Sequence, residues 1–160
     1  MQVMGVKDVQ AALAKINHDT KVVEFGSSTA TSQEAAGNVG CQLGQIVKSL
    51  GFMVNKSTPV LVLASGDQTI DERKLAAIFG VGRKKVRMMT AAQCLDLLGY
   101  APGGVPPLAH RRTVDVYLDD TLRRFQTVYA AGGAANAIFP IELETLQAMT
   151  SGTFVDLARA

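Results

Sequence analysis

The sequence predicts an α+β domain built from interleaved β-strands and α-helices. Its 160 residues are the size of one ordinary domain, so we expect a single domain over residues 1–160. Apolar residues make up 48% of the chain and charged residues 19%, which is typical of a folded globular protein. Strand-like and helix-like runs alternate along the chain, but most connections between strands lack the regular helix of a doubly wound sheet.

The first third of the chain predicts a helix, a short strand and a second helix. Residues 22–25 have the composition of a short strand. Thr31 and Glu34 have the spacing of a capping box, so we expect a helix over residues 32–40. The first helix is indicated by apolar residues at helical spacing and should end near Asn17 and His18; these residues are Val6, Val9, Leu13 and Ile16.

The middle of the chain predicts a β-hairpin. Residues 45–54 and 59–64 are strand-like runs, and the polar stretch at residues 55–58 between them has the composition of a hairpin turn.

Two further helices should follow the hairpin. One begins at Asp71, which can cap it, and runs to Phe79, with Gly80 as its stop. In the other, Thr90 and Gln93 repeat the capping-box spacing, and that helix should continue to Gly99.

The segment from Gly99 to His110 is too rich in glycine and proline to be a helix or a central strand, so we expect a shaped loop. Three strand-like runs follow the loop, and a last helix is expected over residues 142–149. The three strands are residues 114–118, 127–131 and 137–141.

Lys48 lies inside the first strand of the hairpin. Because side chains alternate between the faces of a strand, its ammonium shares a face with Ile46, Leu50, Phe52 and Val54. Burying an unpaired cation is costly, so a lysine on an apolar face needs a carboxylate or an anionic or polar ligand. Lys48 is therefore a candidate site residue. The alternative is a lysine whose stem lies along the core while its head reaches water.

Four short motifs follow one another in a specific order. They are the helix start at Ser32–Ala36, the strand that carries Lys48, the turn Ser65-Gly66-Asp67, and Gly99-Tyr100 leading into Gly103-Gly104-Val105-Pro106-Pro107. In this order and spacing they resemble the YbaK family. Its members are free-standing aminoacyl-tRNA deacylases related to the editing insertion domain of bacterial prolyl-tRNA synthetase. The resemblance extends from about Val22 to about Ala148.

The resemblance implies a mixed, partly barrel-like β-sheet flanked by helices, and hydrolysis of an aminoacyl-tRNA ester without a cofactor. It implies that Lys48 is catalytic, binding the phosphate or carbonyl end of the substrate and stabilising negative charge. It also implies that the glycine-to-proline loop lines the editing pocket. Backbone N–H groups of such a loop can stabilise an oxyanion, so we expect Gly103 and Gly104 to be catalytic. Substrate contacts are expected from Thr29, Thr31, Val105, Pro107, Asp119, Gly132 and Gly133.

Simpler structural roles remain open for several of these residues. Thr31 can be the N-cap of its helix, which is worth about 1 kcal/mol. Asp119 can orient the lysine or only cap the turn after its strand. His110 can be a general base near the loop or a surface histidine, and the loop itself can be a rigid turn that joins a helix to a strand. Four apolar residues can belong to the core or to the pocket wall: Val47, Phe52, Met53 and Val105.

The chain departs from the family pattern in two places. Relatives that act on cysteinyl-tRNA commonly have Ser-Ala-Gly before the last glycine turn, where this chain has Ala130-Ala131-Gly132-Gly133 and so lacks the serine hydroxyl. The loop has Pro106 and Ala109 where many relatives have serine and glycine. These departures concern the substrate and the activity and leave the fold inference unchanged.

Other classes of protein are not indicated. The longest unbroken apolar run, Val60–Ala64, is far shorter than the roughly 20 residues that a membrane span requires. The N-terminus has no apolar signal-peptide core after a basic stretch, so we expect a cytoplasmic protein. Cys41 and Cys94 belong to no paired-cysteine motif, so we expect neither a disulfide nor a metal site.

The net charge of +2 is too small to indicate a nucleic-acid-binding protein by itself. Three local clusters of positive charge are either solvated surface or contacts for the phosphates of an extended RNA. They are the run Arg83, Lys84, Lys85 and Arg87, the pair Arg111 and Arg112, and the pair Arg123 and Arg124.

The sequence therefore favours trans-editing, the hydrolysis of a mischarged aminoacyl-tRNA that carries a small amino acid. A methyl or hydroxyl difference gives a synthetase only roughly 10- to 200-fold discrimination, so a separate editing pocket is useful. The expected partners are the 3′ end of aminoacyl-tRNA and an aminoacyl-tRNA synthetase. The alternative is a non-catalytic module that binds a tRNA end or an aminoacyl ligand and partners a synthetase.

Overall fold

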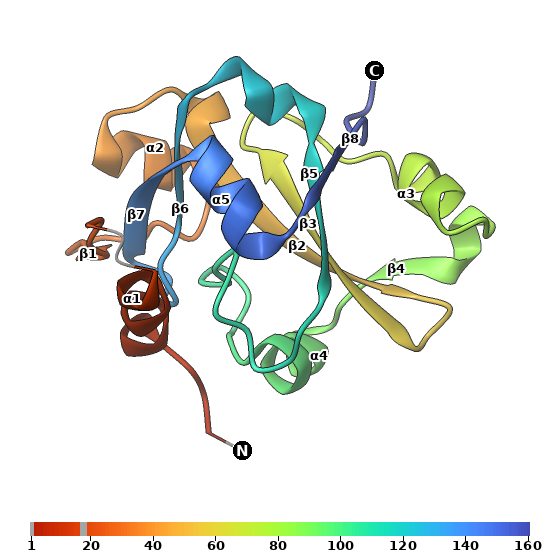
Figure 1. Cartoon of the computed structure of the whole chain (residues 1–160), viewed down its shortest axis with the longest axis horizontal. Helices are drawn as coiled ribbons and strands as arrows, with labels where there is room; N and C mark the ends of the chain where they lie inside the picture. Colours follow the sequence, from red (N-terminus) through yellow and green to blue (C-terminus); the bar gives the residue numbers. More distant parts are fainter. Residues whose placement is uncertain (1, 17–18) are drawn as a thin grey trace.

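The computed structural model describes residues 2–16 and 19–160 and has a mixed β-sheet at its centre (Figure 1). The strand order is β1-β7-β6-β2-β3-β5-β8, and β4 also pairs with β2. The predicted mixed sheet flanked by helices is confirmed, and the sheet is open rather than closed into a barrel. The strands are β1 (Val23–Glu24), β2 (Ile46–Val54), β3 (Thr58–Ser65), β4 (Val86–Met88), β5 (Asp115–Asp119), β6 (Thr127–Ala131), β7 (Ala137–Glu142) and β8 (Thr153–Val155).

The sheet contains both parallel and antiparallel pairs. Strand β2 is antiparallel to β3 and β4 but parallel to β6. Strands β3 and β5, and β5 and β8, pair in parallel, whereas β7 is antiparallel to both β6 and β1. This mixture agrees with the irregular connections expected from the sequence.

The predicted hairpin joins β2 to β3. Asn55 and Lys56 adopt left-handed backbone angles, with φ of 53° and 64°, and the Ser57 N–H donates to the Val54 carbonyl at 3.2 Å. Two left-handed residues in a row match the right-handed twist of the flanking strands. The long, regular pairing of β2 with β3 follows from this turn, starting at Val54 opposite Thr58.

The predicted helices are present with bounds shifted by one or two residues. The expected end of the first helix at residues 17 and 18 lies outside the described residues. The fourth predicted helix is regular for one turn and then widens into a π-helical turn, Cys94–Leu98 (η3), which ends at Gly99 with φ of 98°. The α-helices are α1 (Val6–Lys15), α2 (Ser32–Val39), α3 (Glu72–Ile78), α4 (Ala91–Gln93) and α5 (Leu143–Thr150).

The sequence patterns missed several short elements. Strands β4 and β8 have three residues each and are held by pairing with β2 and β5, so they have no clear periodicity of their own. Three short 3₁₀ helices were also missed: η1 (Leu43–Gln45), η2 (Arg83–Lys85) and η4 (Asp120–Arg124).

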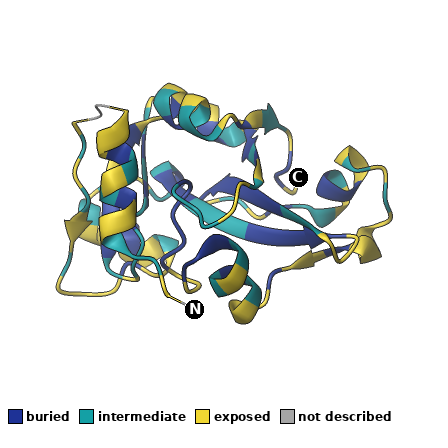
Figure 2. Ribbon diagram, turned by 60° about the horizontal axis from the view of Figure 1, so that its bottom comes forward, coloured by how far each residue is buried: buried dark blue, intermediate teal, exposed yellow. Residues whose placement is uncertain are grey.

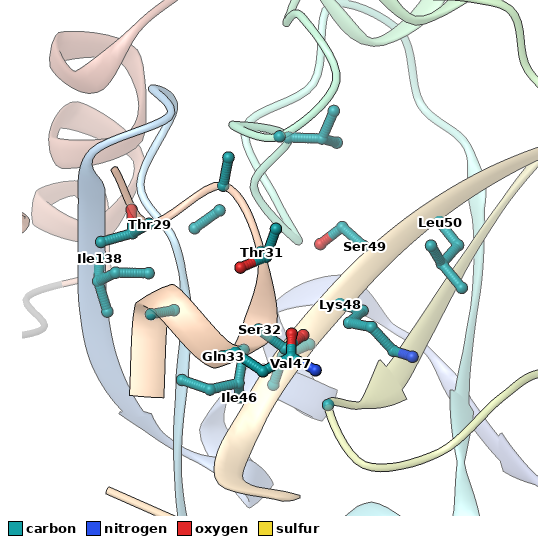
Figure 3. Close-up of a pocket in the computed structure, with 16 residues that line it drawn as sticks. Thr29, Thr31, Ser32, Gln33, Ile46, Val47, Lys48, Ser49, Leu50 and Ile138 are labelled. Atoms are coloured by element: carbon teal, nitrogen blue, oxygen red, sulfur yellow. The ribbon is translucent and has the colours of Figure 1, made fainter. Parts of the chain in front are cut away.

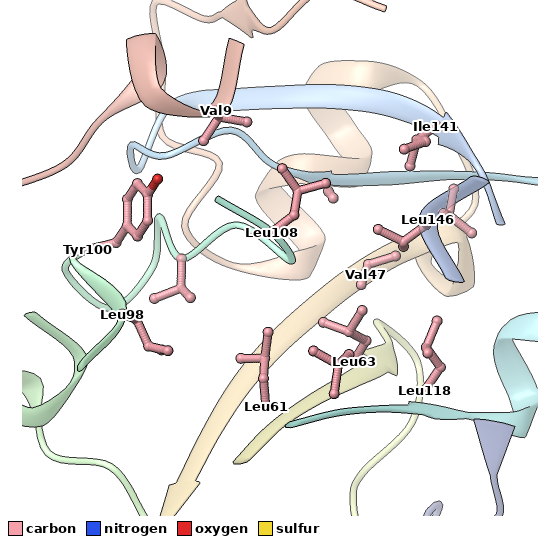
Figure 4. Close-up of a cluster of buried hydrophobic side chains, with 14 of the residues drawn as sticks. Val9, Val47, Leu61, Leu63, Leu98, Tyr100, Leu108, Leu118, Ile141 and Leu146 are labelled. Carbon is pink, nitrogen blue, oxygen red and sulfur yellow. The ribbon is translucent and has the colours of Figure 1, made fainter. Parts of the chain in front are cut away.

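The central hairpin buries both of its faces, as the dark blue strands in Figure 2 show. Leu61 and Leu63 point into the larger core, which α1, α5 and the loop after Gly99 cover (Figure 4). Val60 and Val62 point to the other face, which is covered by α3 and by Leu157. Burial of each such side chain contributes roughly 1.5–3 kcal/mol to stability. The hairpin is therefore a rigid support for side chains on the edge of β2.

Candidate functional site

The outer edge of β2 is interrupted. Its first residues pair with β6, ending at Val47 opposite Ala130, and its last residues pair with β4, beginning at Phe52 opposite Met88. Among the described strands, none pairs with this edge between Lys48 and Leu50. Backbone groups alternate between the edges of a strand, and the Gly51 carbonyl accepts from Met89 on this edge at 2.9 Å. The N–H and C=O of Ser49 therefore also face the open segment.

A cavity of about 360 Å³ lies beside this open segment (Figure 3). Residues from β2, from the start of α2, from the glycine loop and from the β6–β7 pair form its walls, so segments far apart in the sequence meet there. Eight apolar residues contribute to the wall: Ala30, Ala35, Ile46, Val47, Leu50, Val105, Ala131 and Ile138. The polar and charged lining consists of Thr29, Thr31, Ser32, Gln33, Lys48 and Ser49.

Lys48 is the one charged residue in this lining, and its side chain is partly buried. Its ammonium donates a hydrogen bond to the Gln68 carbonyl, in the turn after β3. Desolvation lowers the pKa of Lys48 below the usual 10.5, and the negative charge of Asp67 acts in the opposite direction. The predicted shared face is confirmed for Leu50, Phe52 and Val54, because they pack in one cluster with Ala64, the cross-strand partner of Lys48. Ile46 packs in a separate cluster against α2. Lys48 is thus a desolvated cation held by a neutral carbonyl beside a cavity.

The turn that holds Lys48 is fixed by Arg124. The guanidinium donates to both carboxylate oxygens of Asp67, at 3.0 and 2.7 Å, and to the Ser65 hydroxyl at 2.8 Å. The Ser65 hydroxyl in turn donates to the Gly44 carbonyl. Hydrogen bonding from Arg124 is the main reason that the pKa of Asp67 falls from 3.8 to about 2. A Cβ atom at Gly66 would lie 2.4 Å from the Leu43 carbonyl oxygen, so this turn requires glycine.

Hydroxyl groups approach the cavity from two sides. The Thr31 hydroxyl accepts from the Glu34 N–H at 3.1 Å, and the Glu34 carboxylate accepts from the Thr31 N–H at 3.2 Å, so the predicted capping box is confirmed. Thr29 is buried, and its hydroxyl donates to the Ala135 carbonyl at 3.2 Å. Ser49 lies on β2 across from Thr31 (Figure 3), and its hydroxyl is buried with no hydrogen-bond partner among the described residues.

The glycine loop presents only part of its sequence to the cavity. Gly103, with φ of 92°, and Val105 line the cavity. The Gly104 N–H donates to the Ala101 carbonyl at 3.2 Å, and a Cβ atom at Gly104 would lie 2.8 Å from the Ala134 backbone. Gly104 is therefore a packing position whose N–H is already engaged. Pro107 is buried and lines a different, smaller cavity.

His110 lies beside the loop and is partly buried, which corrects the expectation of a surface histidine. Its Nε2 lies 2.7 Å from the Pro106 carbonyl, which can only accept, so this nitrogen carries the proton. Burial lowers the pKa of His110 below 6.5, although the bond to Pro106 acts in the opposite direction. His110 is absent from the lining of the main cavity and anchors the loop.

Asp119 and the last glycine turn, Gly132-Gly133, do not line the Lys48 cavity. Asp119 is fully buried, and its carboxylate accepts from the backbone N–H groups of Leu157 and Ala158 at 2.7 and 2.9 Å. It thus ties β5 to the segment after β8 and caps the turn, whereas Lys48 is held by Gln68. Gly132 and Gly133 allow close packing, since Cβ atoms there would lie 2.4 Å from Val22 and 2.8 Å from the Gly5 backbone. Contacts of these three residues with substrate remain predictions.

Two residues of the site were missed from the sequence. Ser49 adjoins Lys48, and alternation alone would place it on the opposite face, away from any common site. Lys48 and Ser49 both reach the cavity, because no described strand pairs with this edge of β2 between Lys48 and Leu50. Arg124 was expected only as part of a surface cluster, because its partner Asp67 lies 57 residues away. No local pattern signals either contact.

This arrangement can hold a negatively charged or carbonyl oxygen next to a small apolar group. Lys48 supplies a positive charge, Ser49 an unused hydroxyl, and Gly103 and Val105 a backbone close to the cavity. Among the described residues, no cluster of three or more His, Cys, Asp or Glu side chains could hold a metal ion. No helix within the described ranges is long and apolar enough to cross a membrane.

Comparisons with known proteins agree with this geometry. The family model of the aminoacyl-tRNA editing domain matches residues 26–149. Protein YwhH of Bacillus subtilis is 34% identical over 157 residues, 98% of each chain. EbsC of Enterococcus faecalis, named as a candidate Cys-tRNA(Pro)/Cys-tRNA(Cys) deacylase, is 26% identical over 79% of this chain and 76% of its own. A crystal structure of a candidate trans-editing enzyme for prolyl-tRNA synthetase superposes with a TM-score of 0.89, at 38% identity over 97% of each chain.

Proposed function

Because this chain belongs to the aminoacyl-tRNA editing domain family, we propose that it hydrolyses the ester of mischarged aminoacyl-tRNA that carries a small amino acid. The family assignment supports editing, and the names of the relatives support ester hydrolysis. The choice of a small amino acid rests on the cavity. Its volume of about 360 Å³ is near the lower end of ligand pockets and must hold part of the terminal ribose as well.

The observation that carries this proposal is the placement of Lys48. A desolvated ammonium stabilises negative charge more strongly than an exposed one, because less water screens it. The carbonyl of Gln68 keeps the Lys48 side chain at the edge of the cavity without neutralising it. An ester carbonyl or the terminal phosphate bound in the cavity would therefore meet a positioned positive charge.

Hydrolysis in this site needs no protein nucleophile, since an aminoacyl ester is already activated. The oxygen of water bonds to the carbonyl carbon, the bond from that carbon to the ribose oxygen breaks, and the ribose oxygen takes up a proton. Lys48 and backbone N–H groups at Gly103 and Val105 would stabilise the oxyanion that forms between these two events. One such donor is worth roughly 100- to 1,000-fold in rate.

The wall opposite Lys48 favours a small, neutral side chain. Val105, Ala131 and Ile138 are apolar, and no carboxylate of the described residues lines the cavity. A charged amino acid would be desolvated there without a partner. Larger side chains would meet α2 at Ala35, a buried residue that also lines the cavity.

We place this reaction in the cytoplasm, on the 3′ end of tRNA, with a synthetase as the source of the mischarged substrate. The terminal adenosine would be held by stacking and ribose hydroxyl contacts rather than by a base code. The solved relative described as a trans-editing enzyme for prolyl-tRNA synthetase supports such a partnership.

A non-catalytic binding module is the second candidate. One observation favours it: Ala130 stands where relatives that act on cysteinyl-tRNA commonly carry serine, so that hydroxyl is missing next to Ala131, which lines the cavity. Such a module would bind the tRNA end in the same cavity and leave the ester intact.

The test is release of amino acid from tRNAs charged with alanine, serine, threonine, cysteine and proline. We expect one or two small amino acids to be released by the wild type and by Lys7→Ala, which removes an exposed lysine on α1. Lys48→Ala should abolish that release while keeping its fold, judged by circular dichroism and thermal unfolding. Folded wild type that releases none of them would contradict hydrolysis and support the binding module. Full activity of folded Lys48→Ala would contradict the role of the lysine.

A further inference from the structure

A second groove, of about 670 Å³, lies at the other end of β2, between the hairpin tip and the segment that contains β4. Four cations line it, Lys56 from the hairpin and Lys84, Lys85 and Arg87 from η2 and β4, and all four are exposed. We call it the basic groove. A shallower groove of about 530 Å³ shares Lys84 and Arg87 and adds Arg83.

The charges of the basic groove have no internal partner. Within the described ranges, none of its four cations forms an ion pair, and no carboxylate lines the groove. The whole chain carries only +2, so these four charges leave the rest of the protein net negative. Like charges gathered on one surface repel one another and attract a polyanion from solution. The groove therefore has the electrostatic character of a phosphate-binding surface.

The other two basic clusters of the sequence are engaged within the protein except at Arg112, which is exposed and forms no ion pair among the described residues. Arg124 is bound to Asp67 and Ser65, and Arg123 pairs with Asp120 at 3.6 Å and lies 4.3 Å from the centre of the Phe154 ring. Arg111 donates to the Gln2 carbonyl. Of the three clusters, the run from Arg83 to Arg87 thus offers the most charge to a ligand, and only Arg83 in it is paired, with Glu72 at 3.4 Å.

The basic groove and the Lys48 cavity lie on the same edge of one strand. Strand β4 pairs with β2 (Figure 1). This pairing uses the edge of β2 that is open at Ser49, so the two sites follow one another along that edge. Lys48 and Val54 lie six positions apart, about 20 Å at ~3.3 Å per residue. That length corresponds to about six nucleotides stacked at 3.4 Å. An RNA whose 3′ end enters the cavity can run past β4.

We propose that the basic groove binds the phosphate backbone of tRNA several nucleotides from its 3′ end. This proposal rests on the proposed function, because that function places the 3′ end beside Lys48. The groove supplies affinity by releasing counterions, a sequence-independent contribution that weakens as salt rises. Its polar rim of Asn55, Thr90 and Gln93 can add hydrogen bonds to phosphate or ribose oxygens.

The test compares two triple variants that remove the same charge. Lys84→Ala/Lys85→Ala/Arg87→Ala empties the groove of three exposed cations, whereas Lys7→Ala/Lys15→Ala/Lys21→Ala removes three exposed lysines at the N-terminal end of the chain. Binding of uncharged tRNA is measured by fluorescence anisotropy over a series of salt concentrations. Uncharged tRNA keeps this measurement independent of whether the protein hydrolyses esters.

We expect the groove variant to bind tRNA about 10- to 100-fold more weakly at low salt and to lose about three units from the slope of log affinity against log salt. The control variant should keep most of the affinity and the slope. In deacylation, the groove variant should raise KM for charged tRNA but hydrolyse a short aminoacyl-CCA trinucleotide at the wild-type rate.

Wild-type affinity and slope in the groove variant would overturn the proposal, and an acidic protein surface would then be the better partner. An equal loss in both triple variants would overturn it too, because bulk charge rather than the groove would be responsible. If the wild type hydrolyses the ester but the groove variant binds tRNA like the wild type, only the inference about the groove is rejected. A groove effect on tRNA binding without hydrolysis would reject only the proposed enzyme activity.

Discussion

Lys48 and the cations of the basic groove lie along one edge of β2, yet their surroundings are opposite. Lys48 is partly buried, its pKa is lowered by desolvation, and the Gln68 carbonyl holds it. Lys84, Lys85 and Arg87 are exposed and, among the described residues, have no ion-pair partner. A positioned, desolvated charge can act on the reacting ester, whereas exposed charges can supply only screened attraction. The same type of side chain thus suits two different tasks.

The largest expected difference between the two regions is in rate and its response to salt. Lys48→Ala should lower kcat/KM for deacylation by about 100-fold or more, in the same proportion at low and high salt, because a buried interaction is weakly screened. Lys84→Ala should lower kcat/KM only a few-fold, and this decrease should vanish at high salt. Deacylation kinetics at about 0.05 and 0.3 M salt, where the Debye length changes more than twofold, measure both. If the decrease in kcat/KM caused by Lys48→Ala became smaller at high salt, Lys48 would act as another phosphate contact and not on the reacting ester.

The second prediction concerns the carboxylate near Lys48. Asp67→Asn removes the negative charge that raises the pKa of Lys48, so that pKa should fall further and the alkaline limb of the pH–rate profile should move to lower pH. The loss of its bidentate pair with Arg124, partly exposed at 33% and 42%, should destabilise the fold by no more than about 1 kcal/mol.

Asp120→Asn is the matched control for Asp67→Asn, since it breaks the exposed pair with Arg123 instead. Its pH–rate profile should equal that of the wild type. An unmoved alkaline limb in Asp67→Asn would show that Asp67 does not act on the titration of Lys48. The wild type should also lose the stability contributed by Asp67 as pH falls from 3.8 toward about 2, because the folded pKa lies below the unfolded one.

The smallest expected effect concerns Ser49, on the open segment between the two regions. Its hydroxyl is buried without a partner, so Ser49→Ala should leave the free energy of unfolding unchanged or raise it by up to about 1 kcal/mol. The same substitution should lower kcat/KM several-fold if the hydroxyl binds substrate. Ser65→Ala is the comparison, because the Ser65 hydroxyl bonds to Gly44 and Arg124, and its loss should cost about 1–3 kcal/mol. Equal destabilisation of both variants in urea unfolding would contradict an unused hydroxyl at Ser49.

Local chemistry determined much of the fold. The capping boxes at Thr31 and Thr90, the left-handed glycines at Gly80 and Gly99, and the polar hairpin at Asn55 each act over a few residues, so their signals are visible in the sequence. Alternation along β2 correctly placed Lys48 on the face of Phe52 and Val54. The order of the motifs sufficed to identify the family, which the editing-domain match over residues 26–149 confirmed.

Only the tertiary structure decided how the site is assembled. The pairing of β2 with β6 joins residues more than 80 positions apart and stops at Val47, which opens the edge where Ser49 and Lys48 meet the cavity. Other long-range contacts bring the Arg124 guanidinium to the Asp67 carboxylate. They also place Gly103 at the cavity wall, whereas Gly104 packs against Ala134. Periodicity reports the face on which a residue lies, but strand register, and with it the neighbour across a gap, depends on packing of the whole sheet.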